Sequence, residues 1–143
     1  MNFTIKKIVS FFFFSMPFFV NAQQNMDTIF YDSYWGKTNI KDSVKFYRTS
    51  TKLENLYKVE DYYISNKIQM IGHEVSLYQD SKTGHFQYFY ENGNVFSEGN
   101  FEYNEREGVW KYYYENGKIW YQTFYYKGSK NGEMKSFYRS GEL

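Results

Sequence analysis

The sequence predicts an all-β protein: an elongated, single antiparallel meander sheet of stacked β-hairpin repeats, with a small N-terminal cap in which a short helix is expected. Three features of the 143 residues support this fold class. A 24-residue unit repeats from Gly84 onward, an Asn-Gly pair lies inside each full unit, and 24% of the residues are aromatic, including 17 Tyr. Tyrosine favours strands over helices, and this length supports one domain.

The repeat occupies the second half of the sequence. Its full units are GHFQYFYENGNVFSEGNFEYNERE (84–107) and GVWKYYYENGKIWYQTFYYKGSKN (108–131), followed by the half unit GEMKSFYRSGEL (132–143). Glycines mark equivalent structural positions, at the opening of each unit and in each turn: Gly84, Gly108 and Gly132, then Gly93, Gly117 and Gly141. Because 24 is even, equivalent side chains stay on the same face of a sheet.

Each unit is predicted to be a hairpin around its Asn-Gly pair, in Glu-Asn-Gly-Asn (91–94) and Glu-Asn-Gly-Lys (115–118). Both central residues of a type I′ turn need positive φ, which Asn tolerates and Gly adopts freely, so we expect type I′ turns. Aromatic side chains alternate along the strands and predict aromatic ladders on the sheet. A lone hairpin is marginal in water, so the hairpins must stack.

Residues 1–22 are typical of a secretory signal peptide. Two lysines precede an apolar run of about 13 residues, and Val20-Asn21-Ala22 supplies small residues before a cleavage site at Ala22-Gln23. The run is shorter than the roughly 20 residues that span a bilayer, so export to the periplasm, outer surface or medium is preferred over a membrane anchor. No stable membrane span is expected after cleavage.

Between the signal peptide and the repeats, residues 23–58 are predicted to form a cap that covers the first sheet edge, with a disordered leader as the alternative. Ile40, Val44 and Tyr47 fall on one face of a helix, which predicts a helix over 39–48. The repeat domain spans 59–143 and opens with a degenerate repeat (60–83) whose Asn66 takes the turn-glycine position. We expect a sheet of seven or eight strands that starts near Leu56.

The run G-x-W-x-x-Y-Y-E-N-G-K at 108–118, its copy at 84–94 and E-G-x-F at 98–101 resemble the bacterial variant of the MORN repeat, in particular proteins labelled YwqK-type antitoxins. The resemblance covers 84–143. It implies a repeat architecture with a protein-interaction role. Two departures are visible: Thr123 replaces Gly99, and Asn104 stands where Gly128 does, so the second hairpin is expected to lack the close backbone approach that glycine permits.

No residue pattern predicts an enzyme, a metal site or a cofactor. His73 and His85 have no metal-ligand spacing, Cys is absent, and no nucleophile elbow or phosphate loop occurs. Most carboxylates lie in predicted turns. A net charge of +1 argues against a nucleic-acid surface.

The aromatic side chains are the candidates for binding, unless sheet packing uses all of them. The residues expected to contact a partner share one aromatic face of the repeats: Tyr88, Trp110, Tyr112, Tyr114 and Trp120. A second candidate surface is the sheet edge formed by the half repeat, where self-association or addition of a partner strand is expected. Alternatively, the charged residues Glu133, Lys135 and Arg139 protect this edge against such pairing.

The leading functional hypothesis is therefore an exported module that binds an unknown protein or cell-envelope component. An antitoxin that binds a toxin directly is the second, although export argues against a cytoplasmic toxin. A cell-wall carbohydrate-binding module is the third, because aromatic hairpin repeats of that class carry similar W-Y-Y and N-G elements.

Overall fold

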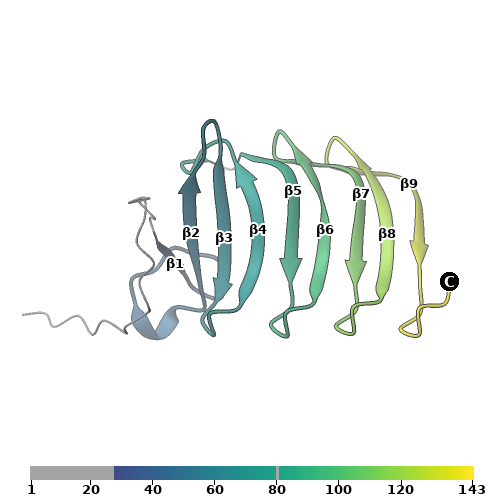
Figure 1. Ribbon diagram of the computed structural model, residues 1–143, viewed down its shortest axis with the longest axis horizontal. Helices are drawn as coiled ribbons and strands as arrows, with labels where there is room; N and C mark the ends of the chain where they lie inside the picture. Colours follow the sequence, from purple (N-terminus) through teal and green to yellow (C-terminus); the bar gives the residue numbers. More distant parts are fainter. Residues whose placement is uncertain (1–27, 80) are drawn as a thin grey trace, which may run out of the picture.

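The computed structural model describes residues 28–79 and 81–143, so the predicted signal peptide lies outside the described residues. In the described part, nine strands form one antiparallel sheet whose spatial order is the order of the sequence (Figure 1). The strands are β1 (Ile29–Tyr31), β2 (Phe46–Lys52), β3 (Tyr57–Tyr63), β4 (Ile68–Glu74), β5 (Lys82–Phe89), β6 (Val95–Glu102), β7 (Glu105–Tyr113), β8 (Ile119–Tyr126) and β9 (Ser129–Ser136).

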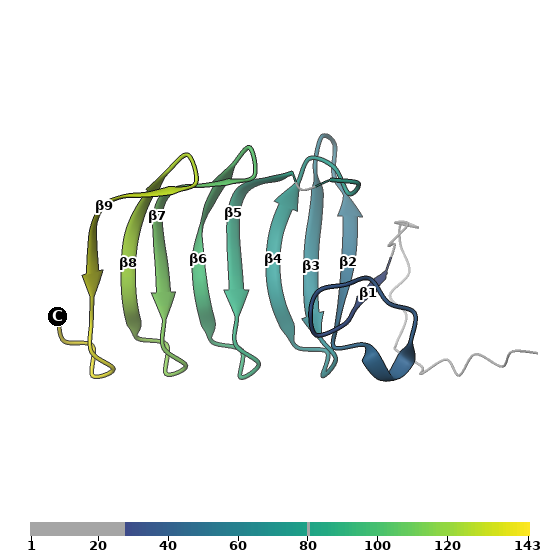
Figure 2. The same ribbon diagram turned by 180° about the vertical axis from the view of Figure 1, so that it is seen from behind.

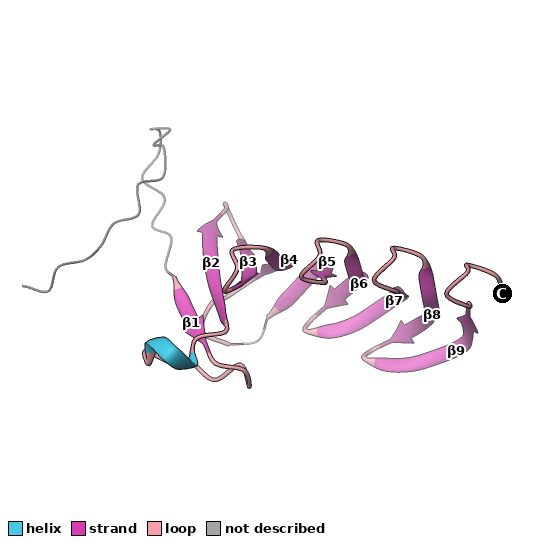
Figure 3. Ribbon diagram, turned by 90° about the horizontal axis from the view of Figure 1, so that it is seen from below, coloured by secondary structure: helices cyan, strands magenta, loops and turns pink. Residues whose placement is uncertain are grey.

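The sheet confirms the predicted all-β meander. Seen from in front and from behind, the strands follow one another along the long axis, with β1 and β9 at opposite ends (Figure 1, Figure 2). Viewed from below, the strands of the later hairpins are curved (Figure 3). Each neighbouring pair is antiparallel, and β5 to β9 make the two full hairpins and the half unit.

The sheet begins earlier than expected. Strands β1 and β2 belong to the segment that was expected to cap the edge, and they bring the described sheet to nine strands instead of seven or eight. The helix expected over 39–48 is reduced to one 3-10 turn, Lys41–Ser43. Phe46 and Tyr47 pair with Tyr63 and Tyr62 of β3 instead, and Tyr47 stacks on Tyr62 at 4.9 Å. Cross-strand aromatic contacts outweigh a short helical pattern.

The expectation of type I′ turns at the Asn-Gly pairs is wrong. Tyr90 N donates to Asn94 O (2.8 Å), Gly93 N donates to Tyr90 O (2.9 Å), and of the Asn-Gly pair only Gly93 has a positive φ, 92°. This is a three-residue loop in which glycine follows a type I turn. The Asn92 side chain stabilises this loop and also contacts the next one, because it accepts from Asn94 N (2.9 Å) and donates to Glu115 O (3.2 Å).

Type I′ geometry occurs at the opposite ends of the strands. The two-residue turns there are Tyr103-Asn104, with φ of 48° and 67°, and Lys127-Gly128, with φ of 46° and 74°. Asn104 adopts the conformation that Gly128 adopts in the next unit, so this departure from the repeat pattern preserves the turn.

One face of the sheet, which we call the inner face, carries the core. Its fully buried side chains are Val59, Met70, Phe86 and Trp110. Tyr88 and Phe101 pack against both of the clusters into which the buried residues of the described chain group, so the core is continuous along the array. The other, outer face carries polar side chains such as His85, Gln87 and Lys111 beside further rings.

Two glycines let large rings lie flat on the neighbouring strand. A Cβ on Gly72 would lie 2.1 Å from the ring of Phe86, and one on Gly99 would lie 2.4 Å from the ring of Trp110. In the next unit Thr123 pairs with Met134, which stays 57% exposed. The glycine and the large ring are therefore exchanged together, and the close approach that was expected to be lost at Thr123 is absent there.

A buried charge cluster joins β2 to the degenerate repeat. Arg48 donates to both carboxylate oxygens of Asp61 (2.6 and 2.9 Å) and to Glu74 (3.1 Å). Both carboxylates are buried, at positions that Tyr88 and Phe101 occupy one unit later. Where the degenerate repeat lacks two rings, one arginine from the expected cap donates hydrogen bonds to two acids.

Candidate partner-binding surface

A tyrosine at the end of each outgoing strand ties its unit to the next one. The hydroxyl groups of Tyr63, Tyr90 and Tyr114 donate to the carbonyl oxygens of Phe89 (2.8 Å), Tyr113 (2.7 Å) and Phe137 (3.0 Å). Equivalent bonds recur from unit to unit because the units repeat. Each ring is held at both ends, by its strand and by its hydroxyl, so the rings keep fixed positions on the inner face.

β-bulges place further side chains beside these tyrosines. The register shifts by one residue between Tyr88 and Phe89 and between Tyr112 and Tyr113, which leaves Phe96 and Trp120 as the extra residues of β6 and β8. Phe96 contacts the rings of Tyr90 (5.2 Å between centroids) and Tyr112 (6.2 Å), and Trp120 contacts Tyr114 (5.8 Å). We call Tyr90, Phe96, Tyr114 and Trp120 the aromatic row.

The aromatic row is accessible, although it lies directly on the core. Phe96 is 37% exposed and Trp120 is 43% exposed. At one end of the row a hollow of about 410 Å³ opens between Tyr114, Trp120 and Tyr138, and Ser136, Phe137 and Leu143 complete its lining. A partner side chain entering this hollow would meet rings on more than one side.

The five residues expected to contact a partner divide between the core and this surface. Trp110 and Tyr112 are buried, and Tyr88 packs between the two core clusters. Tyr114 and Trp120 are accessible and lie side by side. Direct contact from Trp110 and Tyr112 would need the rings around them to move, whereas Tyr114 and Trp120 need no movement. Their role in binding stays a prediction.

Phe96 was missed as a contact residue. Alternation alone places it on the face opposite Tyr88, because residues 95 to 97 alternate in a regular strand. The bulge brings it to the inner face, and the sequence carries no glycine or other signal at the bulge itself. The recurrence of an aromatic residue at Phe96 and Trp120, 24 residues apart, was the available signal.

Burial keeps several tyrosine hydroxyl groups of the inner face protonated, so that they act as donors at neutral pH. Burial raises the pKa of Tyr88 to about 12 and also raises the pKa of Tyr63 and Tyr90 above its usual value. Burial, together with a hydrogen bond to Tyr125, raises the pKa of Tyr112. The phenols of Tyr63 and Tyr90 therefore stay protonated, and the bonds that these two tyrosines donate to the next unit persist across the physiological pH range.

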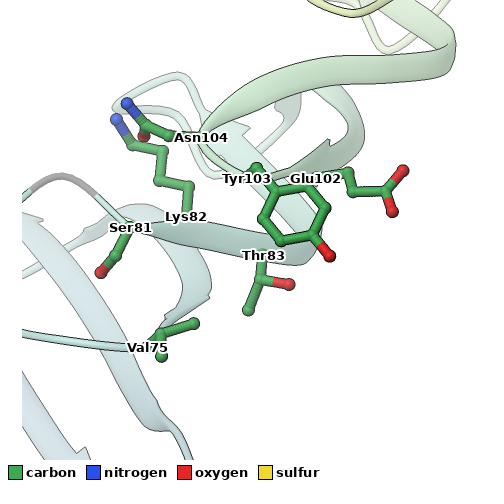
Figure 4. A pocket seen from close by; sticks show the side chains of 7 residues that line it. All are labelled: Val75, Ser81, Lys82, Thr83, Glu102, Tyr103 and Asn104. Carbon is green, nitrogen blue, oxygen red and sulfur yellow. The ribbon is translucent and has the colours of Figure 1, made fainter.

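A larger hollow, of about 480 Å³, lies at the opposite ends of the strands (Figure 4). It is lined by Val75, Ser81, Lys82, Thr83, Glu102, Tyr103 and Asn104. Lys82 and Asn104 project together on one side of it, and the Glu102 carboxylate projects on the other (Figure 4). Its rim thus offers one cation and one anion, which favours no single class of ligand.

His85 does not belong to this surface. His85 Nε2 lies 3.7 Å from Glu98 Oε2 on the outer face, and Glu98 also accepts from Tyr113 (2.6 Å). Among residues 28–79 and 81–143, no three His, Asp or Glu side chains are grouped so that they could hold a metal ion. The described residues contain no helix with the length and apolarity that a membrane crossing requires.

The comparisons with known proteins agree with this geometry. The family model of the MORN repeat variant matches residues 82–103 and 106–127, which are the β5–β6 and β7–β8 hairpins. No curated protein and no solved structure matches the chain significantly. MORN repeats are generally non-catalytic modules that bind proteins or membranes. The two hairpins that hold the aromatic row are therefore the part of the chain that matches the MORN repeat variant.

Proposed function

We propose that the protein is an exported, non-enzymatic repeat module that binds another protein, or an envelope component, through the aromatic row. The observation that carries this proposal is the partial exposure of Phe96 and Trp120 beside tyrosines whose hydroxyls are tied to the next unit. Fixed aromatic rings lose little conformational entropy on binding, and such rings dominate many protein interfaces.

The ring angles favour a protein partner over a polysaccharide. The planes of Tyr90 and Phe96 lie at 74°, and those of Tyr114 and Trp120 lie at 33°. A sugar chain stacks best on rings that present one flat platform, and the row presents none. The hollow beside Trp120 instead suits an apolar side chain of a folded partner or peptide.

Export is part of the proposal and rests on residues 1–22. Protein isolated from the source cells should be found outside the cytoplasm, and its first residue should be Gln23. N-terminal sequencing of the fractionated protein measures this. An uncleaved chain in the cytoplasm would remove export from the proposal and would make a toxin partner, and hence an antitoxin role, the first alternative.

Trp120→Ala is expected to weaken partner binding at least about tenfold, because interface aromatic residues of this kind contribute on the order of 2 kcal/mol. Phe124→Ala is the matched control. Phe124 lies on the same strand, is 42% exposed against 43% for Trp120, and pairs with Val109 on the outer face. Affinity isolation of the tagged protein from source cells, with quantitative mass spectrometry, measures the recovered partner.

The comparison of the two variants shows whether the partner binds at the aromatic row or elsewhere on the protein. A protein lost with Trp120→Ala and retained with Phe124→Ala supports the proposal. Equal recovery with both variants would contradict it. Binding to purified cell-wall polysaccharide that is lost with Trp120→Ala and retained with Phe124→Ala would replace the protein partner by a carbohydrate.

A further inference from the structure

The last strand of the described sheet is open on one side. Strand β9 pairs with β8, and within residues 28–79 and 81–143 no strand pairs with its other edge. Every residue of β9 is exposed. A free edge of this kind offers backbone donors and acceptors to another strand.

Hydrogen bonds around β9 show which of its backbone groups point outward. Phe137 N donates to Trp120 O, towards β8, and Tyr138 N donates to Glu142 O on the opposite side (both 2.8 Å). Successive residues of an antiparallel strand point their N–H and C=O groups to alternate sides. The backbone groups of Ser136 and Met134 therefore point away from β8, as those of Tyr138 do.

The side chains of β9 are complementary to a second copy of the same strand. In the antiparallel register that places Met134 opposite Met134 of the second copy, Glu133 lies opposite Lys135 of that copy, and Lys135 lies opposite its Glu133. Two cross-strand pairs of opposite charge form by symmetry. Met134, which is 57% exposed on the inner face, meets its own copy at the two-fold axis.

We infer that two copies of this protein associate by antiparallel pairing of their β9 strands from Gly132 to Ser136, with Met134 at the two-fold axis. The pairing stops at Ser136, because the turn that bonds Glu142 to Tyr138 occupies the space beside Tyr138. It gives one continuous eighteen-strand sheet in the described parts of two chains. So short an interface forms a weak dimer, whose population depends on concentration.

This dimer does not depend on the proposed partner. It would, however, join two aromatic rows on one inner face, since Met134 lies between the row of one copy and that of the other. A partner with two binding segments would then gain affinity from both rows.

Charge exchange tests the register. Sedimentation equilibrium of the wild-type protein, from micromolar to hundreds of micromolar, should show a monomer–dimer equilibrium. Glu133→Lys places lysine opposite lysine twice, and Lys135→Glu places glutamate opposite glutamate twice, so each variant alone should raise the dimer Kd about tenfold or more. The double exchange, Glu133→Lys with Lys135→Glu, should restore the wild-type Kd.

An equimolar mixture of the two single variants should also dimerise, because each then meets the opposite charge. Lys67→Glu, at an exposed position in the β3–β4 turn, is the matched control and should leave the Kd unchanged. Far-UV circular dichroism checks that every variant folds. A monomeric wild type at all concentrations, single variants that dimerise like the wild type, or a mixture that stays monomeric would each overturn the inference.

Discussion

Replacing Arg48 by Met is expected to lower the free energy of unfolding by about 3–5 kcal/mol, since removal of one partner leaves buried charges without compensation. Arg48 is the hydrogen-bond partner of both Asp61 and Glu74, and both carboxylates are buried. Methionine keeps most of the volume and removes the charge. Urea denaturation at pH 7, followed by tyrosine or tryptophan fluorescence, measures the difference.

The pH dependence of this effect has a defined sign. Burial already raises the pKa of Glu74 in the presence of Arg48, and loss of the cation would raise it further. Protonation of Glu74 removes part of the uncompensated charge, so the difference between Arg48→Met and wild type should shrink as the pH falls from 7 towards 4.

The matched control is Lys58→Met. Lys58 bonds Glu60 at 2.7 Å, but its side chain is 40% exposed, so this substitution should cost less than about 1 kcal/mol. Equal losses for the two variants would contradict the account of Arg48 as the residue that holds the degenerate repeat together.

Gly99→Ala is expected to destabilise the fold by about 3 kcal/mol, at the upper end of the cost of overpacking a core. The new Cβ would lie 2.4 Å from the ring of Trp110, which is fully buried and cannot move aside. Thermal or urea unfolding of the variant measures the loss. Phe86 and Gly72 form the same contact one unit earlier, so Gly72→Ala should behave alike.

The next unit supplies the control for this prediction. There, Thr123 pairs with Met134, at the positions that Gly99 and Trp110 occupy in the preceding unit. The double variant Gly99→Thr with Trp110→Met copies that pair, and its loss of stability should be clearly smaller than the sum of the two single losses, because methionine leaves room for the threonine. Additive losses would show that the glycine has another role.

The period of 24 residues and the aromatic alternation were enough to predict an all-β meander, because identical spacing forces each hairpin into the same place beside the last. The close packing over Gly99, and its loss at Thr123, could also be predicted, since a missing Cβ is visible in the sequence. The strand β2 was not predicted, although only residues 53–56 separate it from β3, because the helical spacing of Ile40, Val44 and Tyr47 masked the aromatic pairing of the two strands.

The turns and the aromatic row show where sequence patterns are insufficient. An Asn-Gly pair is compatible with more than one loop, and the side-chain bond from Asn92 to the next turn selects the three-residue form. The bulges at Phe96 and Trp120 follow from that loop, because the extra loop residue shifts the register. Alternation along β7 selected Trp110 and Tyr112, which are buried, and Phe96 was missed although its equivalent Trp120 was selected.

Contact between a partner and the aromatic row of the inner face can be detected in the source cells. Site-specific photo-crosslinking in the source cells tests it most directly, with a benzophenone amino acid in place of Trp120 or, on the outer face of the same strand, in place of Phe124. We expect a defined crosslinked species from position 120 and none from position 124. Crosslinks from position 124 alone, or the same species from both positions, would contradict it.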